Sequence, residues 1–156
     1  MKWNEYEELV VDCCEEAVGR CNDAGLVDVP RWMMTKQQGG WYADGYRRID
    51  VLLSERRRGG ISILVDAKHY VASPAIPKHI IIKLDRDRQI RRASHSILIA
   101  SPDSYVPESI IEELEENYPL TIITRETFDF VNDEEQLVRF LTSSMIAISR
   151  NGPNSL

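Results

Sequence analysis

The residues IDVLLSERRRGGISILVDAK, positions 49–68, decide the fold of this chain. Two apolar runs, 49–53 and 61–65, are separated by a short polar segment that ends in Gly59 and Gly60. Short runs rich in Val, Ile and Leu between turn residues are typical of buried strands, and paired glycines supply the positive φ angles that tight connections need. The stretch therefore predicts a β-hairpin.

Charged residues lie at the open end of this hairpin. Asp50 opens the first run, and Asp66-Ala67-Lys68 closes the second. Alternate residues of a strand share a face, so Asp66 and Lys68 project to one side and Ala67 to the other. Burying carboxylates beside an ammonium group carries a desolvation cost, which a bound divalent cation can offset. The pattern predicts a Mg²⁺ site, with Mn²⁺ as its substitute ion.

Length and composition favour one globular domain. The chain has 156 residues, 43% of them hydrophobic and 28% charged, which is enough to close a single core. We expect one domain over 1–150 and a disordered tail over 151–156. The sequence shows no secretory signal and no apolar run long enough to span a bilayer, so we expect a cytoplasmic protein with no membrane contact. Its three cysteines are expected to be reduced and packed.

Charge is distributed unevenly along the chain. The formal net charge of −6 argues by itself against a nucleic-acid partner. However, residues 31–92 hold fourteen Lys and Arg against six Asp and Glu, whereas 1–30 and 93–156 are both acidic. Basic character is thus concentrated in the segment that carries the predicted site, which favours a polyanionic substrate.

Two basic clusters account for most of this positive charge. The first is Arg56, Arg57 and Arg58 at the hairpin tip, and the second follows the hairpin as a series through Lys78, Lys83 and Arg86 to Arg92. Each cluster alone is equally well explained as a solvated surface. Together, next to a predicted metal site, they favour contact with phosphates.

The remaining pattern predicts alternating helices and strands. A helical period opens the chain, and a strand, helix, strand unit near its end predicts parallel pairing with a right-handed crossover. A turn-rich loop is expected over 39–45, and the chain as a whole is expected to be α/β. The predicted elements are a helix over 3–21, a strand over 31–35, the hairpin, a helix over 76–92, a strand over 97–100, a helix over 107–117, a strand over 120–124 and a helix over 133–148.

One carboxylate of the first helix stands out. On a helical wheel the other acids of this helix fall on the polar face, whereas Glu7 lies at the edge of the apolar face. A carboxylate there must be paired, hydrogen-bonded or near a metal. Pairing with an arginine at the edge of the core is the alternative to a role in the site.

Taken in order, these elements resemble the PD-(D/E)xK nuclease superfamily, and within it the Mrr-type restriction endonuclease domains. The resemblance covers most of the chain and rests on Tyr6-Glu7 in the first helix, Ile49-Asp50-Val51 on one strand and Asp66-Ala67-Lys68 on the next. Ile49 stands where the superfamily's name has a proline. The resemblance implies a restriction-endonuclease-like core of three layers, with a mixed central sheet between helices. It also implies a further functional residue in the helix after the motif, for which Lys78, Lys83 and Gln89 are candidates.

The residues support a consistent chemistry for phosphodiester hydrolysis. Asp50 and Asp66, with the backbone carbonyl of Ala67, are expected to bind Mg²⁺, which activates water and neutralises charge on phosphorus. Lys68 would orient the attacking water or stabilise the charged transition state. Glu7 would hold a water molecule or assist a second ion.

Other polar and aromatic residues have two interpretations. His69 and His95 follow or open strands without a second histidine at ligand spacing, which favours local hydrogen bonds. Asp44 lies in a glycine-flanked loop and is expected to be a turn residue. Four aromatic residues precede Asp50 and would either stack on bases or pack at a sheet edge, namely Trp32, Trp41, Tyr42 and Tyr46.

Three functional hypotheses follow. The first is a Mg²⁺-dependent endonuclease acting on DNA in restriction or defence, as a homodimer in which each protomer cuts one strand. The second is a junction resolvase on the same core, selective for branched DNA. The third is a non-catalytic module that binds nucleic acid or assembles with a basic protein partner through the acidic regions 1–30 and 93–156.

Overall fold

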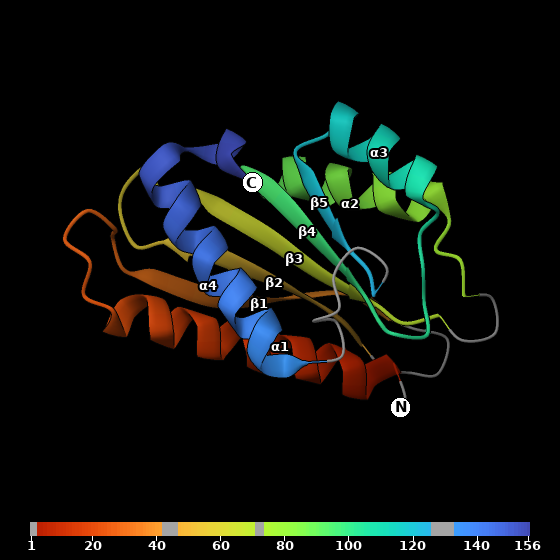
Figure 1. Ribbon diagram of the computed structural model, residues 1–156, viewed down its shortest axis with the longest axis horizontal. Helices are drawn as coiled ribbons and strands as arrows, with labels where there is room; N and C mark the ends of the chain where they lie inside the picture. Colours follow the sequence, from red (N-terminus) through yellow and green to blue (C-terminus); the bar gives the residue numbers. More distant parts are fainter. Residues whose placement is uncertain (1–2, 42–46, 71–73, 126–132) are drawn as a thin grey trace.

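In the computed structural model, which describes residues 3–41, 47–70, 74–125 and 133–156, one mixed sheet of five strands forms the centre of the protein (Figure 1). The strands lie in chain order. The first three are antiparallel and the last two extend the sheet in parallel. Their bounds are β1 Trp32–Trp41, β2 Arg47–Glu55, β3 Ser62–Lys68, β4 His95–Ala100 and β5 Leu120–Ile123.

The predicted hairpin is confirmed as β2 and β3. Their register runs from Val51 opposite Val65 to Ser54 opposite Ser62. The connection is closed by Glu55, whose backbone N–H donates to the carbonyl of Ile61 at 2.9 Å and whose side chain accepts from the Ile61 N–H at 2.7 Å. Gly59 has a φ of 70°, the left-handed conformation for which a glycine was expected.

Helices cover both faces of the sheet, so the fold is α/β with three layers. Helices α1 (Trp3–Asp23) and α4 (Glu134–Asn151) pack on one face, and α2 (Lys78–Ile90) and α3 (Glu108–Asn117) on the other (Figure 1). Pro107 and Asp133 precede α3 and α4 as N-caps, and the Asp133 side chain accepts from backbone N–H groups of the first turn of α4. The predicted order of helices and strands is confirmed.

Each face of the sheet has its own hydrophobic core because side chains alternate along the strands. Leu53, Ile63 and Val65 pack towards α1 and α4, whereas Leu64 and Leu98 pack towards α2 and α3. All five are at most 1% exposed. Strands covered on both sides read as continuous apolar runs, which explains the sequence of β3 and β4.

The first helix is tied to the first strand at its end. The Asn22 side chain accepts from the backbone N–H of Trp32 at 2.8 Å and donates to the carbonyl of the same residue at 3.0 Å. On the buried side of this helix lie the three cysteines, which are free thiols. Burial raises the pKa of Cys13 to about 11, with nearby carboxylates adding to the effect. The prediction of reduced, packed thiols is confirmed.

Two segments differ from expectation. Strand β1 continues through Gly39 and Gly40 to Trp41, where we expected a loop, because β2 offers it a pairing partner along this whole length. The register shifts between Gln38 and Trp41, and glycines are common at such irregularities. The remainder of the expected loop, with Asp44, lies outside the described residues.

The end of the chain also differs from the disordered tail that we expected. Helix α4 continues to Asn151, Gly152 ends it with a φ of 88°, and Pro153–Ser155 form a short 3₁₀ helix, η2. Leu156 packs against the core beneath α1 and α4. The apolar side chain of Leu156 anchors this polar segment to the core. The polar composition of the segment did not indicate this contact. None of the helices in the described part of the chain has the length and hydropathy needed to cross a membrane.

Candidate active site

Asp50, Asp66 and Lys68 meet at one end of the sheet. Asp50 directly precedes Val51 and Asp66 directly follows Val65, the last pair of the antiparallel ladder, and the two acidic side chains interact. The Lys68 ammonium lies 2.8 Å from the Asp66 carboxylate, as expected for residues two apart on a strand. None of the three residues is more than 5% exposed. Two acids and an amine therefore form a buried, compact group.

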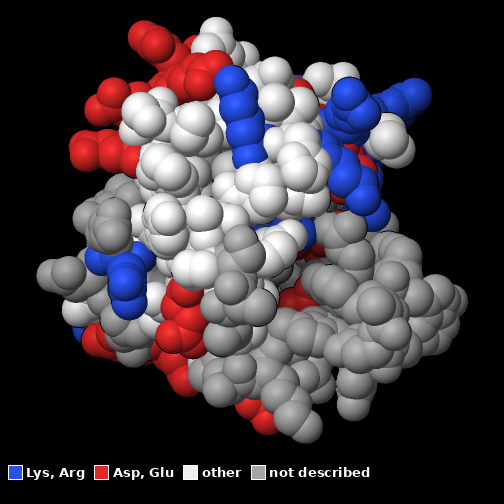
Figure 2. Space-filling view, turned by 90° about the vertical axis from the view of Figure 1, so that its right-hand side faces the viewer, with Lys and Arg blue, Asp and Glu red and all other residues white. Residues whose placement is uncertain are grey.

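This group lies where the parallel strands end. Figure 2 looks onto that end of the molecule, the right-hand side of Figure 1, and shows acidic atoms set back in a hollow with basic atoms beside them. Asp and Glu side chains gather at the upper left of this face and Lys and Arg side chains at the upper right, and both kinds occur together at the lower left (Figure 2). The carboxyl ends of parallel strands are a common place for ligand sites because loops, and not further strands, surround them.

Burial and the neighbouring Asp66 disfavour the ionisation of Asp50. The pKa of Asp50 rises to about 7, first because the side chain is buried and then because the Asp66 charge and a hydrogen bond between the two acids favour the protonated form. Lys68 and Arg91 act in the opposite direction without cancelling these effects. Without a further cation Asp50 is therefore partly protonated near neutral pH.

The chemistry of these donors suits a hard divalent cation. Two carboxylates in a desolvated site provide oxygen ligands and negative charge, and a cation between them would relieve the repulsion that raises the pKa of Asp50. The carbonyl of Ala67 points to the β2 side, because successive carbonyls alternate and that of Lys68 accepts from the backbone N–H of Ser101 after β4, at 2.8 Å. Asp50, Asp66 and the Ala67 carbonyl could thus serve as ligands.

Glu7 lies on a turn of α1 near the site's end of the sheet. It is buried, at 5% exposure, as its place at the edge of the apolar face predicted. Tyr6 beside it donates to the Ala100 carbonyl at 3.2 Å, so this turn of α1 reaches the site's end of the sheet. However, α1 packs on the face opposite to Asp66 and Lys68, and in the described ranges no three His, Cys, Asp or Glu side chains surround a possible metal position. The role of Glu7 in the site stays a prediction.

Arg91 is a site residue that the sequence did not single out. It follows α2 as its C-cap, and its guanidinium lies 3.8 Å from the Asp50 carboxylate. The sequence places it only within a basic series, and nothing in that series distinguishes it from Arg92. The distinguishing signal is three-dimensional, since α2 must pack on the sheet before Arg91 can reach β2.

The candidates in the helix after the motif have other partners or face solvent. Gln89 donates to Asp85 at 2.9 Å, and Lys78 forms an ion pair with Glu113 of α3. Lys83 and Arg86 are exposed on α2. The structure therefore keeps Lys83 and Arg86 available for a large ligand.

The hairpin arginines lie at the wrong end of the sheet for contact with the site. Arg56, Arg57 and Arg58 are exposed at the tip, and Arg57 lies 3.1 Å from Glu55. The nearest of them, Arg56, is six positions along the chain from Asp50, or roughly 20 Å at about 3.4 Å per residue. The expectation that both basic clusters border the acids is wrong for this one, because a hairpin places its tip and its open end at opposite ends of the sheet.

The histidines make local hydrogen bonds, as expected. His69, next to Lys68, lies 2.6 Å from the Ser101 hydroxyl, and Ser101 in turn lies 3.1 Å from the Ser104 hydroxyl. His95 lies 2.8 Å from the Thr121 hydroxyl, and burial lowers its pKa to about 4. The chain of polar groups from His69 fixes the segment that follows the candidate lysine.

Trp32 belongs to the core and does not stack on a ligand. It is 1% exposed, and its indole donates to the Ser149 hydroxyl at 3.0 Å. Tyr42 and Tyr46 and the side chain of Trp41 lie outside the described residues.

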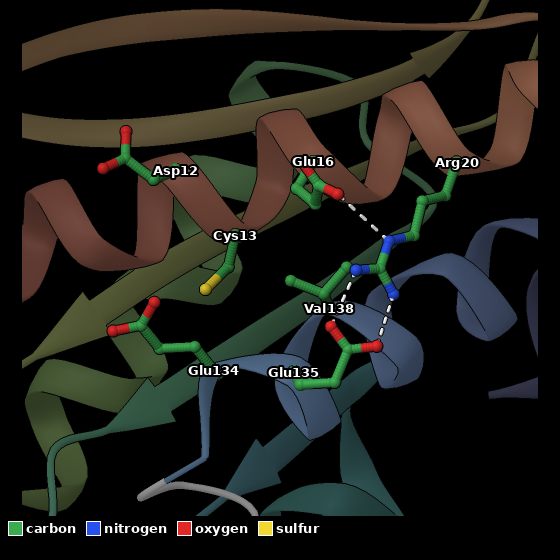
Figure 3. Close-up of a pocket in the computed structure, with 7 residues that line it drawn as sticks. All are labelled: Asp12, Cys13, Glu16, Arg20, Glu134, Glu135 and Val138. Atoms are coloured by element: carbon green, nitrogen blue, oxygen red, sulfur yellow. Dashed lines mark hydrogen bonds and ion pairs between the residues drawn. The ribbon is translucent and has the colours of Figure 1, made fainter.

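A second hollow, of about 280 Å³, lies between α1 and α4 (Figure 3). Acids of both terminal regions line this hollow, Asp12 and Glu16 from α1 and Glu134 and Glu135 from α4. Arg20 donates to both Glu135 oxygens at 2.7 Å and to Glu16 at 3.2 Å. These bonds link the two helices across the hollow, so some of the acidic residues of the terminal regions have a structural role.

Comparison with known proteins gives two distant structural matches. No protein-family model matches the chain, and no curated protein matches it. The DNA modification-dependent restriction endonuclease AspBHI aligns with 99% of this chain at 16% identity and a TM-score of 0.42. The MspJI restriction endonuclease, in complex with a 27-mer oligonucleotide, aligns with 89% at 10% identity and a TM-score of 0.41. The chain spans 42% and 33% of those proteins. We therefore argue function from this chain's own residues.

Proposed function

We propose that this protein is a metal-dependent endonuclease that hydrolyses DNA phosphodiester bonds with Asp50, Asp66 and Lys68. The observation that supports this most strongly is the buried pair of facing carboxylates, one with its pKa raised to about 7, beside an ammonium group 2.8 Å away. An isolated pair of buried acids is costly for folding. Strongly perturbed carboxylates of this kind are typical of functional sites.

The three residues divide the work of hydrolysis. Asp50 and Asp66, with the Ala67 carbonyl, would bind Mg²⁺ or Mn²⁺, which supplies Lewis-acid activation of water and charge neutralisation at phosphorus. Asp66 also holds the Lys68 ammonium in place, as their 2.8 Å separation indicates. From there Lys68 would donate a hydrogen bond to the attacking water or to the developing negative charge on the phosphoryl oxygens.

Exposed basic residues near this end of the sheet would bind the DNA backbone. Lys83 and Arg86 on α2 are exposed, whereas the acidic side chains of α1 and α4 lie across the sheet. We assign the protein to restriction or defence, acting as a homodimer in which each protomer cuts one strand. In this proposal, target recognition would come from dimer geometry, DNA structure or a partner.

A survey of substrates tests the activity. Purified protein is incubated with linear, supercoiled and branched DNA and with RNA, in Mg²⁺, in Mn²⁺ and in EDTA. We expect nicking or cutting of DNA in the presence of either ion and none in EDTA. Preference for branched over linear DNA would identify a junction resolvase, and cleavage of RNA alone would refute the proposed substrate.

One observation favours a second function, a non-catalytic module that binds nucleic acid. Arg91 lies 3.8 Å from Asp50 and already supplies a positive charge beside the acids. Asp66→Ala separates the two functions. The endonuclease loses cleavage and keeps its DNA affinity, measured by fluorescence anisotropy, whereas a pure binding module shows no cleavage in either form and binds DNA equally well or better after the substitution.

A further inference from the structure

The Arg91 guanidinium has hydrogen-bonding capacity that the protein does not use. Its Nη2 atom is 3.8 Å from the Asp50 carboxylate. This distance is short enough for attraction between the charges and too long for a hydrogen bond. Its Nη1 atom is buried and has no hydrogen-bond partner in the described part of the chain. A buried donor without a partner is costly and therefore uncommon.

Two other arginines of the protein have hydrogen-bond partners for their side chains. Arg88, three residues earlier, donates to Asp85 at 2.8 Å and to the Ala93 carbonyl at 3.1 Å. Arg20 uses three nitrogens on two carboxylates. Arg91 differs from them because part of its guanidinium has no hydrogen-bond partner. Its backbone N–H donates to the Asp87 carbonyl at 3.0 Å, and its side chain ends beside the candidate site.

Charge balance explains what these donors are for. Asp50 and Asp66 carry two formal negative charges when ionised, and Lys68 and Arg91 carry two positive ones. A divalent cation bound between the acids would leave the group with two excess positive charges. A phosphodiester is negatively charged and gains charge when it is attacked, so it would restore the balance, and a guanidinium matches two phosphate oxygens geometrically.

We propose that Arg91 exchanges partners during the reaction. In the free protein it neutralises Asp50, and when a cation takes that carboxylate, the guanidinium turns to the non-bridging oxygens of the phosphate to be cleaved. This role rests on the proposed endonuclease function and adds a catalytic residue to it. It also predicts that Arg91 opposes cation binding while it promotes cleavage.

Two measurements on Arg91→Gln test this opposition. The first is the Mn²⁺ affinity of the DNA-free protein by isothermal titration calorimetry, which we expect to increase by at least about fivefold, because removing one positive charge about 4 Å from a metal ligand has roughly this effect even at the dielectric constant of water. The second is single-turnover cleavage in saturating Mg²⁺, which we expect to slow by about 100-fold. Thermal unfolding first verifies that the variant is folded.

Two further variants serve as controls. Arg91→Lys keeps the charge without the planar fork, so Mn²⁺ affinity should stay within about twofold of the wild type while cleavage slows by about tenfold. If Arg91→Gln does not fold, Arg91→Lys still tests the proposal through cleavage, and cleavage at the wild-type rate would overturn it. Arg92→Gln removes the exposed neighbouring charge and should leave Mn²⁺ affinity unchanged.

The possible outcomes are distinct. Unchanged or weaker Mn²⁺ binding by Arg91→Gln, or unchanged cleavage, would overturn the exchange of partners and leave the endonuclease function intact. A wild-type protein that neither binds Mn²⁺ nor cuts DNA, together with an Arg91→Gln variant that binds the ion, would show that Arg91 blocks the site permanently. That result would overturn the proposed function as well.

Discussion

Replacing Asp50 with asparagine should stabilise the metal-free protein while destroying its proposed activity. Asparagine has nearly the same shape as aspartate, cannot ionise and can still donate a hydrogen bond to Asp66. The substitution removes the charge that burial and Asp66 both disfavour. A gain in stability at the cost of function is expected where a binding site holds unfavourably placed charge.

The magnitude follows from the pKa of Asp50, which rises from 3.8 to about 7 on folding. Each pH unit between these values corresponds to about 1.4 kcal/mol, so ionised Asp50 destabilises the folded state by about 4 kcal/mol at pH 8. Because the raised pKa belongs to the folded state, the folded protein keeps a proton that the unfolded chain has lost between about pH 4 and pH 7. The free energy of unfolding therefore falls as pH rises through this window.

The assay is urea-induced unfolding in EDTA, followed by tryptophan fluorescence, for which buried Trp32 is a reporter. We expect Asp50→Asn to exceed the wild type by about 4 kcal/mol near pH 8 and by about 1 kcal/mol near pH 4.5. Asp85→Asn is the matched control, because Asp85 is also buried but is bonded to Arg88 and Gln89. It should destabilise the protein by about 2 kcal/mol at pH 8. An Asp50→Asn variant that is less stable than the wild type at pH 8, or a difference that does not change with pH, would refute the reasoning.

Three further predictions concern the site and the core. Lys68→Met leaves the Asp66 carboxylate buried without the ammonium group beside it. It should abolish cleavage and lower the free energy of unfolding by about 3 kcal/mol, measured by urea unfolding at pH 8. Cleavage at the wild-type rate would exclude a catalytic lysine. Leu53→Ala empties a fully buried position and should cost about 3 kcal/mol in the same assay, and a cost below about 1 kcal/mol would contradict the packing described. The buried thiols, with the pKa of Cys13 raised to about 11, should react with a disulfide reagent at pH 8 only after unfolding in guanidinium, and rapid reaction of the native protein would show that α1 opens readily.

Much of the fold could be predicted from local pattern. The apolar runs of β2 and β3 with their glycine turn specified the hairpin, and alternation along β3 then put Asp66 and Lys68 on one face. The antiparallel register brought Asp50 opposite Asp66. These inferences succeeded because each depends on residues close together in sequence.

Other features depend on long-range packing. Strand β1 runs through two glycines because β2 pairs with it, although its own composition favours a turn. Arg91 reaches Asp50 only because α2 crosses the face of the sheet, whereas α1, which carries Glu7, covers the opposite face. Neither relation is encoded in local periodicity.

One misplacement could have been avoided from the sequence itself. Arg56, Arg57 and Arg58 occupy the closed end of the hairpin that holds Asp50 and Asp66 at its open end. The hairpin prediction already implied this separation. Charge clustering along the sequence gave the opposite impression, because neighbours along a chain need not be neighbours across a sheet.

The most direct test of the catalytic assignment is nicking of supercoiled DNA in Mg²⁺ by the wild type, Asp50→Asn and Asp85→Asn, with unfolding curves confirming that all three are folded. We predict that the wild type and Asp85→Asn nick the DNA, and that the more stable Asp50→Asn does not. Nicking by Asp50→Asn at the wild-type rate would contradict the assignment, because the acid that faces Asp66 would then be dispensable for the chemistry.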